Sequence, residues 1–257
     1  MTARSLEGRV ALITGGAKNL GGLVARDLAA AGARAVVIHY HSEASRTAAE
    51  ETLRAVTAAG AEAIIAQGDL TRPEEVARLF DAAITAFGQV DIAVNTAGLV
   101  IKKAIVDITE AEYDSSFDIN AKAAFFFIQE AGRRLADQGS IVTIVSSLLA
   151  AYTPFYAIYP ASKAAVEHFT RAASKEFGGR GISVNAIGPG PMDTPFFYGQ
   201  ESPEAVAYHS TAAALSGFSR KGLTDIDDIA PIVRFLATEG WWITGQTILA
   251  NGGYTTR

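Results

Sequence analysis

The sequence predicts an α/β fold in which a parallel β-sheet is covered by helices on both faces. Short apolar runs alternate with longer amphipathic segments along the whole chain. The runs are nearly continuous in apolar residues, which is typical of parallel strands buried on both faces. The first run is followed by a glycine-rich turn, a helical stretch and a second strand, the order of a βαβ unit.

The elements follow one another in a regular order. The predicted strands are residues 9–14, 35–38, 62–67, 90–94, 141–145, 182–187 and 247–249. The predicted helices are residues 23–31, 43–59 and 73–87, a long helix beginning at Thr109, a helix from Tyr159 to about residue 177, and residues 225–237. The sequence shows no linker, so we expect one domain over residues 1–257. The irregular segment 195–222, here called the lid segment, is expected to cover a binding site.

The turn after the first strand is rich in glycine. Residues 15–22 read Gly-Gly-Ala-Lys-Asn-Leu-Gly-Gly and lead directly into a helical stretch. A turn of this kind brings backbone N–H groups and a helix N-terminus toward a phosphate. Because it stands between a strand and a helix, it predicts a phosphate-bearing ligand.

The stretch from Ser146 to Lys163 carries the most specific chemistry. Ser146 and Ser147 end an apolar strand, and a helix then begins near Tyr159. Residues four apart share a helix face, so Tyr159 and Lys163 are expected side by side. A fixed ammonium within about 4–6 Å favours phenolate and lowers the tyrosine pKa. A serine hydroxyl can hold a carbonyl oxygen while the tyrosine delivers its proton.

An amide interrupts the apolar face of the long helix. The stripe consists of Tyr113, Phe117, Asn120, Ala124 and Phe127. Two interpretations of Asn120 stay open, a buried asparagine with satisfied hydrogen bonds or a polar group that serves the site.

Composition excludes several classes of function. The net charge of −5 argues against a nucleic-acid partner. The chain has no cysteine and its four histidines show no ligand spacing, so we expect no metal site. No apolar run approaches the roughly 20 residues of a membrane span, and no signal peptide is visible. We therefore expect no membrane partner and a cytoplasmic location.

Taken in order, these motifs resemble the short-chain dehydrogenase/reductase family over essentially the whole chain. Within it, the chain is most similar to the 3-oxoacyl-(acyl-carrier-protein) reductase-like and related carbonyl-reductase branch. The matching pieces are Thr14-Gly15…Gly21, Asp69, Asn95-Thr96-Ala97-Gly98, Asn120, the serine pair, Tyr159-Pro-Ala-Ser-Lys163, Asn185 to Gly190, and Trp242 to Gln246. The resemblance implies a doubly wound Rossmann-type fold with a seven-stranded parallel sheet and helices on both faces.

The resemblance also implies hydride transfer between a nicotinamide nucleotide and a carbonyl compound or secondary alcohol. Tyr159 would be the general acid in reduction and the base in oxidation. Lys163 would lower the pKa of Tyr159 and hold the nicotinamide ribose, and Asn120 would anchor a water chain to Lys163. Ser147 is the expected carbonyl-binding serine, because its spacing to Tyr159 fits members with a shortened loop, and Ser146 is the alternative if the loop has its commoner length.

The same resemblance assigns residues to the cofactor. They are Gly15, Lys18, Asn19, Leu20, Gly21, Tyr40, His41, Ser42, Asp69, Leu70, Asn95, Ala97, Gly98, Tyr159, Lys163, Pro189, Gly190 and Thr194. Asn19 replaces a glycine of the family turn, but asparagine tolerates the left-handed conformation. The second strand ends without the acid of NAD-preferring relatives, and Lys18, His41 and Ser42 could meet a 2′-phosphate. NADP is therefore expected, with NADPH preferred over NADH.

The substrate is less constrained. The aromatic start of the lid segment favours an apolar or ring-bearing carbonyl compound, although these rings could merely pack the lid. For an acyl-carrier-protein substrate, Arg180 fits the basic pattern and Asp137 does not. A catalytically idle nucleotide-binding sensor or scaffold with the same fold is the alternative function. Relatives are usually tetramers that pair the helices holding Asn120 and Tyr159, so a homotetramer acting on a small molecule is expected.

Overall fold

The computed structural model describes residues 4–256. Seven strands form one parallel sheet in the order β3-β2-β1-β4-β5-β6-β7. The strands are β1 Val10–Thr14, β2 Ala35–Tyr40, β3 Glu62–Gln67, β4 Ile92–Asn95, β5 Ser140–Ile144, β6 Ser183–Pro189 and β7 Thr247–Ala250. The order changes direction between β1 and β4, which confirms the predicted doubly wound fold.

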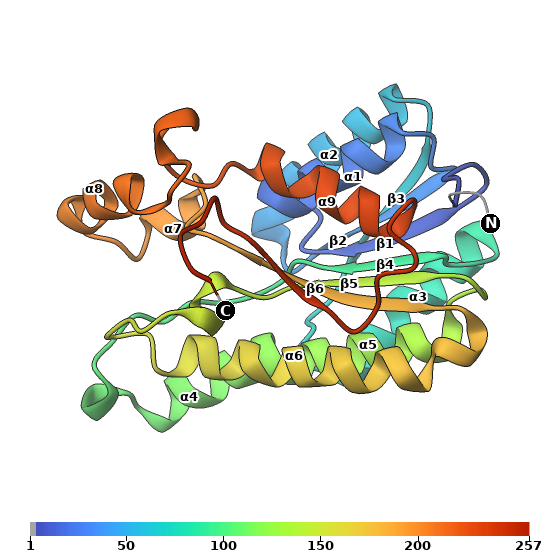
Figure 1. The fold of residues 1–257 in the computed structure, drawn as a ribbon. Helices are drawn as coiled ribbons and strands as arrows, with labels where there is room; N and C mark the ends of the chain where they lie inside the picture. Colours follow the sequence, from blue (N-terminus) through green and yellow to red (C-terminus); the bar gives the residue numbers. More distant parts are fainter. Residues whose placement is uncertain (1–3, 257) are drawn as a thin grey trace.

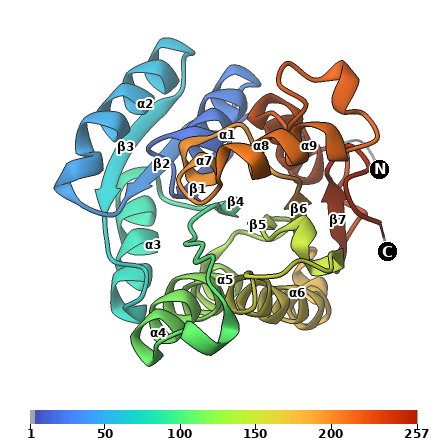
Figure 2. The same cartoon turned by 90° about the vertical axis from the view of Figure 1, so that its left-hand side faces the viewer.

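Helices cover both faces of this sheet, as Figures 1 and 2 show. They are α1 Asn19–Ala30, α2 Arg46–Ala58, α3 Pro73–Phe87, α4 Glu110–Phe117, α5 Ala123–Arg134, α6 Ile158–Glu176, α7 Pro195–Tyr198, α8 Pro203–Ala212 and α9 Ile226–Ala237. Short 3₁₀ turns are Glu43–Ser45, Ile105–Asp107, Ser147–Ala150, Gly178–Arg180 and Ser216–Phe218. Helices α1, α2 and α9 lie on one face, and α3, α5 and α6 lie on the other.

The core consists of two apolar layers, one on each face of the sheet. Every residue of β1, β2, β4, β5 and β6 is buried, as the continuous apolar runs predict. In the layer on the face covered by α3, α5 and α6, the ring centres of Phe80 from α3 and Phe127 from α5 lie 5.5 Å apart. Burying each such side chain contributes roughly 1.5–3 kcal/mol, so the two layers fix the helices against the sheet.

Most element boundaries agree with the sequence within a few residues, and β3 and α3 agree at both ends. The predicted start at Thr109 is confirmed, because the Thr109 N–H donates to the Glu112 carboxylate over 2.8 Å in a capping box. The long helix predicted there is confirmed, because α4, a π-helical turn at Asp118–Lys122 and α5 follow one another without a break, with right-handed helical backbone at both junctions; only the π-helical turn was not predicted. The lid segment is more regular than expected, because it contains α7 and α8.

The carboxyl ends of all seven parallel strands meet at one edge of the sheet. The chain leaves β6 at this edge, and α7 and α8 lie beyond it, at the left of Figure 1. No helix within residues 4–256 is long and apolar enough to cross a membrane.

Candidate active site

A cavity of about 620 Å³ opens at the carboxyl edge of the sheet. Its walls come from the segments that follow β1, β2, β3, β4, β5 and β6, and from the lid segment. It spans the point between β1 and β4 where the strand order reverses, which is where open α/β sheets bind their ligands.

The glycine turn after β1 forms one wall of this cavity. Gly15 and Asn19 have φ angles of +66° and +50°, so Asn19 adopts the left-handed conformation expected of it. A Cβ atom on Gly21 would lie 2.3 Å from the Gly15 carbonyl oxygen, so only glycine permits this close approach of α1 to the turn. The N-terminus of α1 therefore faces the cavity with unpaired N–H groups, a suitable site for phosphate.

His39 supports the glycine turn from the end of β2. The Gly15 N–H donates to Nδ1 of His39 over 3.1 Å, and Nε2 of His39 lies 2.9 Å from the Gly68 carbonyl oxygen. Burial lowers the pKa of His39 to about 4, so the ring is neutral, accepting at Nδ1 and donating at Nε2. His39 was not among the predicted site residues, although its alternation with His41 places both on one face of the strand.

The wall at the end of β2 carries basic and hydroxyl groups, and the nearby carboxylate that lines the cavity, Asp69, comes from the end of β3. Lys18, His41 and Ser45 line the cavity there, and the first two are exposed. Ser42, a predicted cofactor residue, is not among the residues that line the cavity. It caps the short turn Glu43–Ser45, and that turn brings Ser45 to the wall instead.

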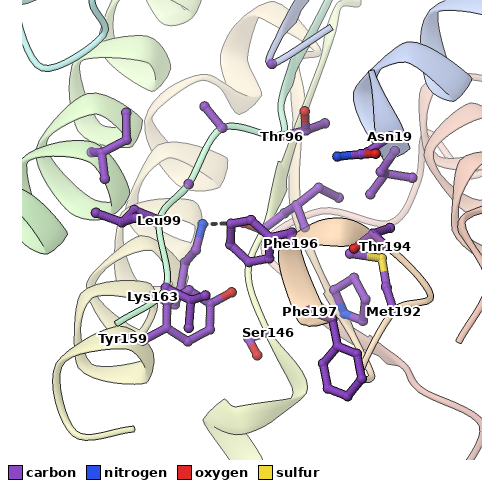
Figure 3. A pocket seen from close by; sticks show the side chains of 18 of the residues that line it. Asn19, Thr96, Leu99, Ser146, Tyr159, Lys163, Met192, Thr194, Phe196 and Phe197 are labelled. Carbon is purple, nitrogen blue, oxygen red and sulfur yellow. Dashed lines mark hydrogen bonds between the residues drawn. The ribbon is translucent and has the colours of Figure 1, made fainter. Parts of the chain in front are cut away.

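Tyr159 and Lys163 lie one turn apart on α6 and both line the cavity. Their side chains are almost completely buried, with 9% and 3% of their surfaces exposed. The Lys163 ammonium donates to the Ile144 carbonyl oxygen over 3.0 Å. Figure 3 shows Tyr159, Lys163 and Ser146 together on one side of the cavity, away from Asn19 and Thr194.

The electrostatics of this pair differ from the sequence expectation. Burial raises the pKa of Tyr159 to about 12, with a smaller opposing effect from its hydrogen bond to Ser146. Burial also lowers the pKa of Lys163 to about 8. The expected lowering of the Tyr159 pKa by Lys163 is therefore not found here. At neutral pH the phenol keeps its proton and the amine keeps its charge.

The structure brings Ser146, rather than Ser147, to the Tyr159 phenol. Ser146 is the last residue before the 3₁₀ turn Ser147–Ala150, and its hydroxyl caps that turn by accepting from the Leu148 N–H over 3.1 Å. Ser147 also lines the cavity but lies within the turn. The structure therefore favours Ser146 over the expected Ser147, because the hydroxyl that hydrogen-bonds to the phenol is that of Ser146.

Asn120 lies behind the cavity wall, on the π-helical turn. Its amide oxygen accepts from the Leu99 N–H over 3.0 Å, and its amide nitrogen donates to the Leu99 carbonyl over 2.7 Å. A Cβ atom on Gly98 would lie 2.9 Å from the Asn120 amide oxygen and 3.2 Å from Nζ of Lys163. Gly98 thus lets α6 and the π-helical turn approach the loop after β4.

Most of the predicted site residues line the cavity. They are Gly15, Lys18, Asn19, Leu20, Gly21, Tyr40, His41, Asp69, Leu70, Ala97, Gly98, Ser147, Tyr159, Lys163, Pro189, Gly190 and Thr194. Asn95, like Asn120, stands behind the wall. Its side-chain oxygen accepts from the Thr14 hydroxyl over 2.6 Å and from the Ala97 N–H over 3.2 Å, and so joins β1 to the loop after β4.

The lid segment supplies a further part of the wall that the sequence did not single out. Phe196 and Phe197 were expected there, and both line the cavity. Glu201 and His209 of the lid segment also line it, beside Tyr156 from the loop before α6. The sequence places Glu201 directly after the uncharged aromatic run 195–200, but nothing in that pattern predicts its burial.

Comparisons with known proteins agree with this architecture. Residues 15–255 match the family model described as Enoyl-(Acyl carrier protein) reductase. A protein of Picea abies named "Short-chain type dehydrogenase/reductase" is 39% identical, over 96% of this chain and 93% of the relative. A protein of Arabidopsis thaliana named "NADPH-dependent aldehyde reductase-like protein, chloroplastic" is also 39% identical, over 97% of this chain and 95% of the relative.

A solved structure is more similar still. It is the crystal structure of a putative dehydrogenase from Burkholderia cenocepacia with bound NADP, which is 65% identical to this chain. The superposition covers 100% of this chain and 97% of the other, with a TM-score of 0.98.

Proposed function

The chain is an oxidoreductase that belongs to the short-chain dehydrogenase/reductase family, and we propose that it transfers hydride between NADP and a small carbonyl compound or secondary alcohol. One observation carries this proposal. The Tyr159 phenol, the Lys163 ammonium and the Ser146 hydroxyl converge on the cavity that begins at the glycine turn.

The cavity has features that fit a nicotinamide dinucleotide phosphate. The glycine turn and the N-terminus of α1 would hold the pyrophosphate. Lys18, His41 and Ser45 would meet the 2′-phosphate, where a carboxylate would repel it. Thr194 lines the other end, and its buried hydroxyl has no hydrogen-bond partner within residues 4–256, as expected of a group that awaits the nicotinamide carboxamide. The Burkholderia cenocepacia relative binds NADP, which supports the same cofactor here.

Side chains of the site would bind the substrate and the cofactor and transfer the proton. The bound cofactor supplies the hydride. Ser146 donates a hydrogen bond to the substrate oxygen, and Tyr159 gives that oxygen its proton in reduction or takes it in oxidation. Lys163 holds positive charge beside the phenol and binds the ribose. Asn120 fixes the loop after β4, and with it the wall next to Lys163.

The substrate that fits best is a free, neutral carbonyl compound. Phe196, Phe197 and the ring of Tyr156 give the substrate end an apolar wall. Arg180, the basic residue that fits an acyl-carrier-protein substrate, lies away from the cavity, because it precedes β6 at the opposite edge of the sheet. It donates to the Asp137 carboxylate over 2.8 Å and to the Gly132 carbonyl over 2.7 Å, which is a structural role.

We further propose that residues 1–257 act as one domain, that residues 195–222 form its lid, and that the protein works as a cytoplasmic homotetramer. Exposed aromatic side chains support assembly. Tyr113 of α4 and Phe125 of α5 are 46% and 42% exposed on the helices that relatives pair, and Trp242 near the C-terminal strand is 80% exposed.

The test is oxidation of NADPH, followed at 340 nm, with a panel of small aldehydes and ketones. We expect turnover that Tyr159→Phe removes, and a kcat/KM for NADPH at least tenfold above that for NADH. Equal rates in wild type and Tyr159→Phe would favour the idle sensor, and comparable use of NADH would overturn the cofactor preference.

A further inference from the structure

A fully buried carboxylate joins the lid segment to the floor of the cavity. Glu201 lies between α7 and α8, and its side chain is 0% exposed. It forms an ion pair with Lys102 and accepts a hydrogen bond from the Tyr156 hydroxyl. Lys102 belongs to the loop after β4 and Tyr156 to the loop before α6. These two loops are themselves joined, because the Lys103 N–H donates to the Phe155 carbonyl over 2.7 Å.

One partner of Glu201, Tyr156, lies in the same buried cluster as Tyr159, the proposed proton donor. The cluster also contains Val100. The Lys102 ammonium lies 5.5 Å from the centre of the Tyr156 ring, within the range of a cation–π interaction. A shift of Glu201 would therefore move Tyr156, which belongs to the same buried cluster as Tyr159.

Helix α8 adds a second link to the same group. Nδ1 of His209 lies 2.9 Å from the Tyr254 hydroxyl, and Nε2 lies 4.0 Å from the Glu201 carboxylate. Burial lowers the pKa of His209, which favours a neutral ring, and Nδ1 of that ring shares a hydrogen bond with the Tyr254 hydroxyl. The charge that balances Glu201 is therefore that of Lys102.

A buried ion pair is a costly way to hold two segments together. Desolvation offsets most of the attraction, so apolar residues of similar volume would stabilise the fold at least as well. What a buried ion pair can add is specificity, since arrangements that separate the two charges leave a buried carboxylate unpaired. This argument favours a role for Glu201 in placing the lid rather than in overall stability.

We propose that Glu201 is a positioning residue, which fixes the lid segment over the reaction centre through Lys102 and Tyr156 and thereby sets the KM for the carbonyl substrate. The kinetic part of this proposal rests on the proposed oxidoreductase function. The placement of the lid does not, so the two parts are tested separately.

Hydrogen–deuterium exchange of the NADPH complex tests the placement without any turnover. Glu201→Gln keeps the size of the side chain and removes its charge. We expect peptides within residues 195–212 to exchange at least tenfold faster in Glu201→Gln, while those of β6 stay unchanged. The matched control is Glu204→Gln, an exposed carboxylate in the first turn of α8, which should exchange like wild type. Unchanged exchange in Glu201→Gln would overturn the proposal.

Steady-state kinetics with NADPH and 9,10-phenanthrenequinone test the consequence. We expect Glu201→Gln and Tyr156→Phe to raise the KM for the quinone at least tenfold, with kcat within about threefold of wild type and the Kd for NADPH unchanged. A fall in kcat at unchanged KM would contradict a positioning role. Absence of quinone turnover in wild type would instead count against the proposed function, and the exchange experiment would still decide the placement.

A double variant tests whether Lys102 and Glu201 act as a pair, because removing both charges should reverse the effect of removing one. Lys102→Met leaves Glu201 buried without a counter-ion, and we expect it to loosen the lid most. The double variant Lys102→Met/Glu201→Gln removes both charges, so its lid exchange should return toward wild type. If the double variant exchanges as fast as Lys102→Met or faster, Lys102 does not act through Glu201 and the proposal fails.

Discussion

At Tyr159 two influences act on the phenol in opposite directions. Burial raises its pKa to about 12, and the Ser146 hydroxyl lowers it by a smaller amount. Burial brings the pKa of Lys163 down to about 8. At neutral pH, which lies below both values, the phenol is protonated and the amine is charged, which is the state that reduction of a carbonyl requires. At neutral pH the Tyr159 phenol is therefore ready to act as the general acid.

The two neighbouring serines allow a matched comparison at this position. Ser146 interacts with the phenol, whereas Ser147 lies within the following 3₁₀ turn. We expect Ser146→Ala to lower kcat at least tenfold, because the substrate oxygen loses a hydrogen-bond donor. Ser147→Ala should change kcat less than threefold. A larger loss in Ser147→Ala than in Ser146→Ala, measured by NADPH oxidation, would reverse the assignment.

His39 makes the stability of the fold depend on pH. Its folded pKa of about 4 lies below the ordinary value of 6.5, because the buried ring is held neutral between Gly15 and Gly68. Above pH 6.5 the ring is neutral in both the folded and the unfolded chain. As the pH falls from 6.5 to 4, the unfolded chain binds the proton first, and stability is lost.

This linkage predicts a measurable loss. Between pH 7.5 and pH 5 the wild-type free energy of unfolding should fall by about 2 kcal/mol through His39 alone. His39→Gln keeps hydrogen-bonding groups but does not titrate, so its loss over the same range should be smaller by that amount. Urea unfolding at the two pH values measures the difference. Parallel losses in both proteins would show that His39 is not the responsible group.

At the scale of elements, the site depends on where α6 meets the π-helical turn. The extra residue of that turn places Asn120 against the loop after β4, and Lys163 reaches the same loop from α6. Gly98 is the point of contact between these elements. π-helical turns inside α-helices occur frequently at functional sites, and this one positions an amide rather than a reacting group.

A single methyl group tests this junction. In Gly98→Ala the added Cβ would lie 2.9 Å from the Asn120 amide oxygen and 3.2 Å from Nζ of Lys163, so both side chains must move. We expect kcat to fall at least tenfold while the circular dichroism spectrum stays that of the folded protein. Gly178→Ala is the control, since its added Cβ has no atom within 4 Å. Wild-type kinetics in Gly98→Ala would mean that the junction tolerates displacement.

For the whole molecule, the sequence predicts the sheet better than it predicts the site. Continuous apolar runs and glycine-ended helices are local signals, and they located β3 and α3 to the residue. The π-helical turn left no such signal, because one inserted residue barely changes an apolar stripe. The choice of Ser146 depends on the path of a loop, and the burial of Glu201 depends on partners in two distant segments. Contacts of this kind are set by tertiary structure.

Assembly follows from the apolar surface that the fold leaves exposed. Phe125 is 42% exposed on α5 and packs edge-on against Phe169 of α6, with ring centres 5.2 Å apart. We expect light scattering to give about four times the 27.0 kDa chain mass. Phe125→Glu should lower this mass by placing a charge in the interface, whereas Phe218→Glu, at a 93% exposed position in the lid segment, should not. A monomeric wild type would refute the tetramer.

The central claim is that the phenol of residue 159 supplies the proton in carbonyl reduction. Its most direct test is a single turnover, in which enzyme saturated with NADPH is mixed with excess 9,10-phenanthrenequinone and absorbance is followed at 340 nm. Tyr159→Phe should slow the decay at least 100-fold with NADPH still bound, and Tyr152→Phe, whose ring is fully exposed to solvent, should match wild type. A Tyr159→Phe decay as fast as that of wild type would contradict the claim.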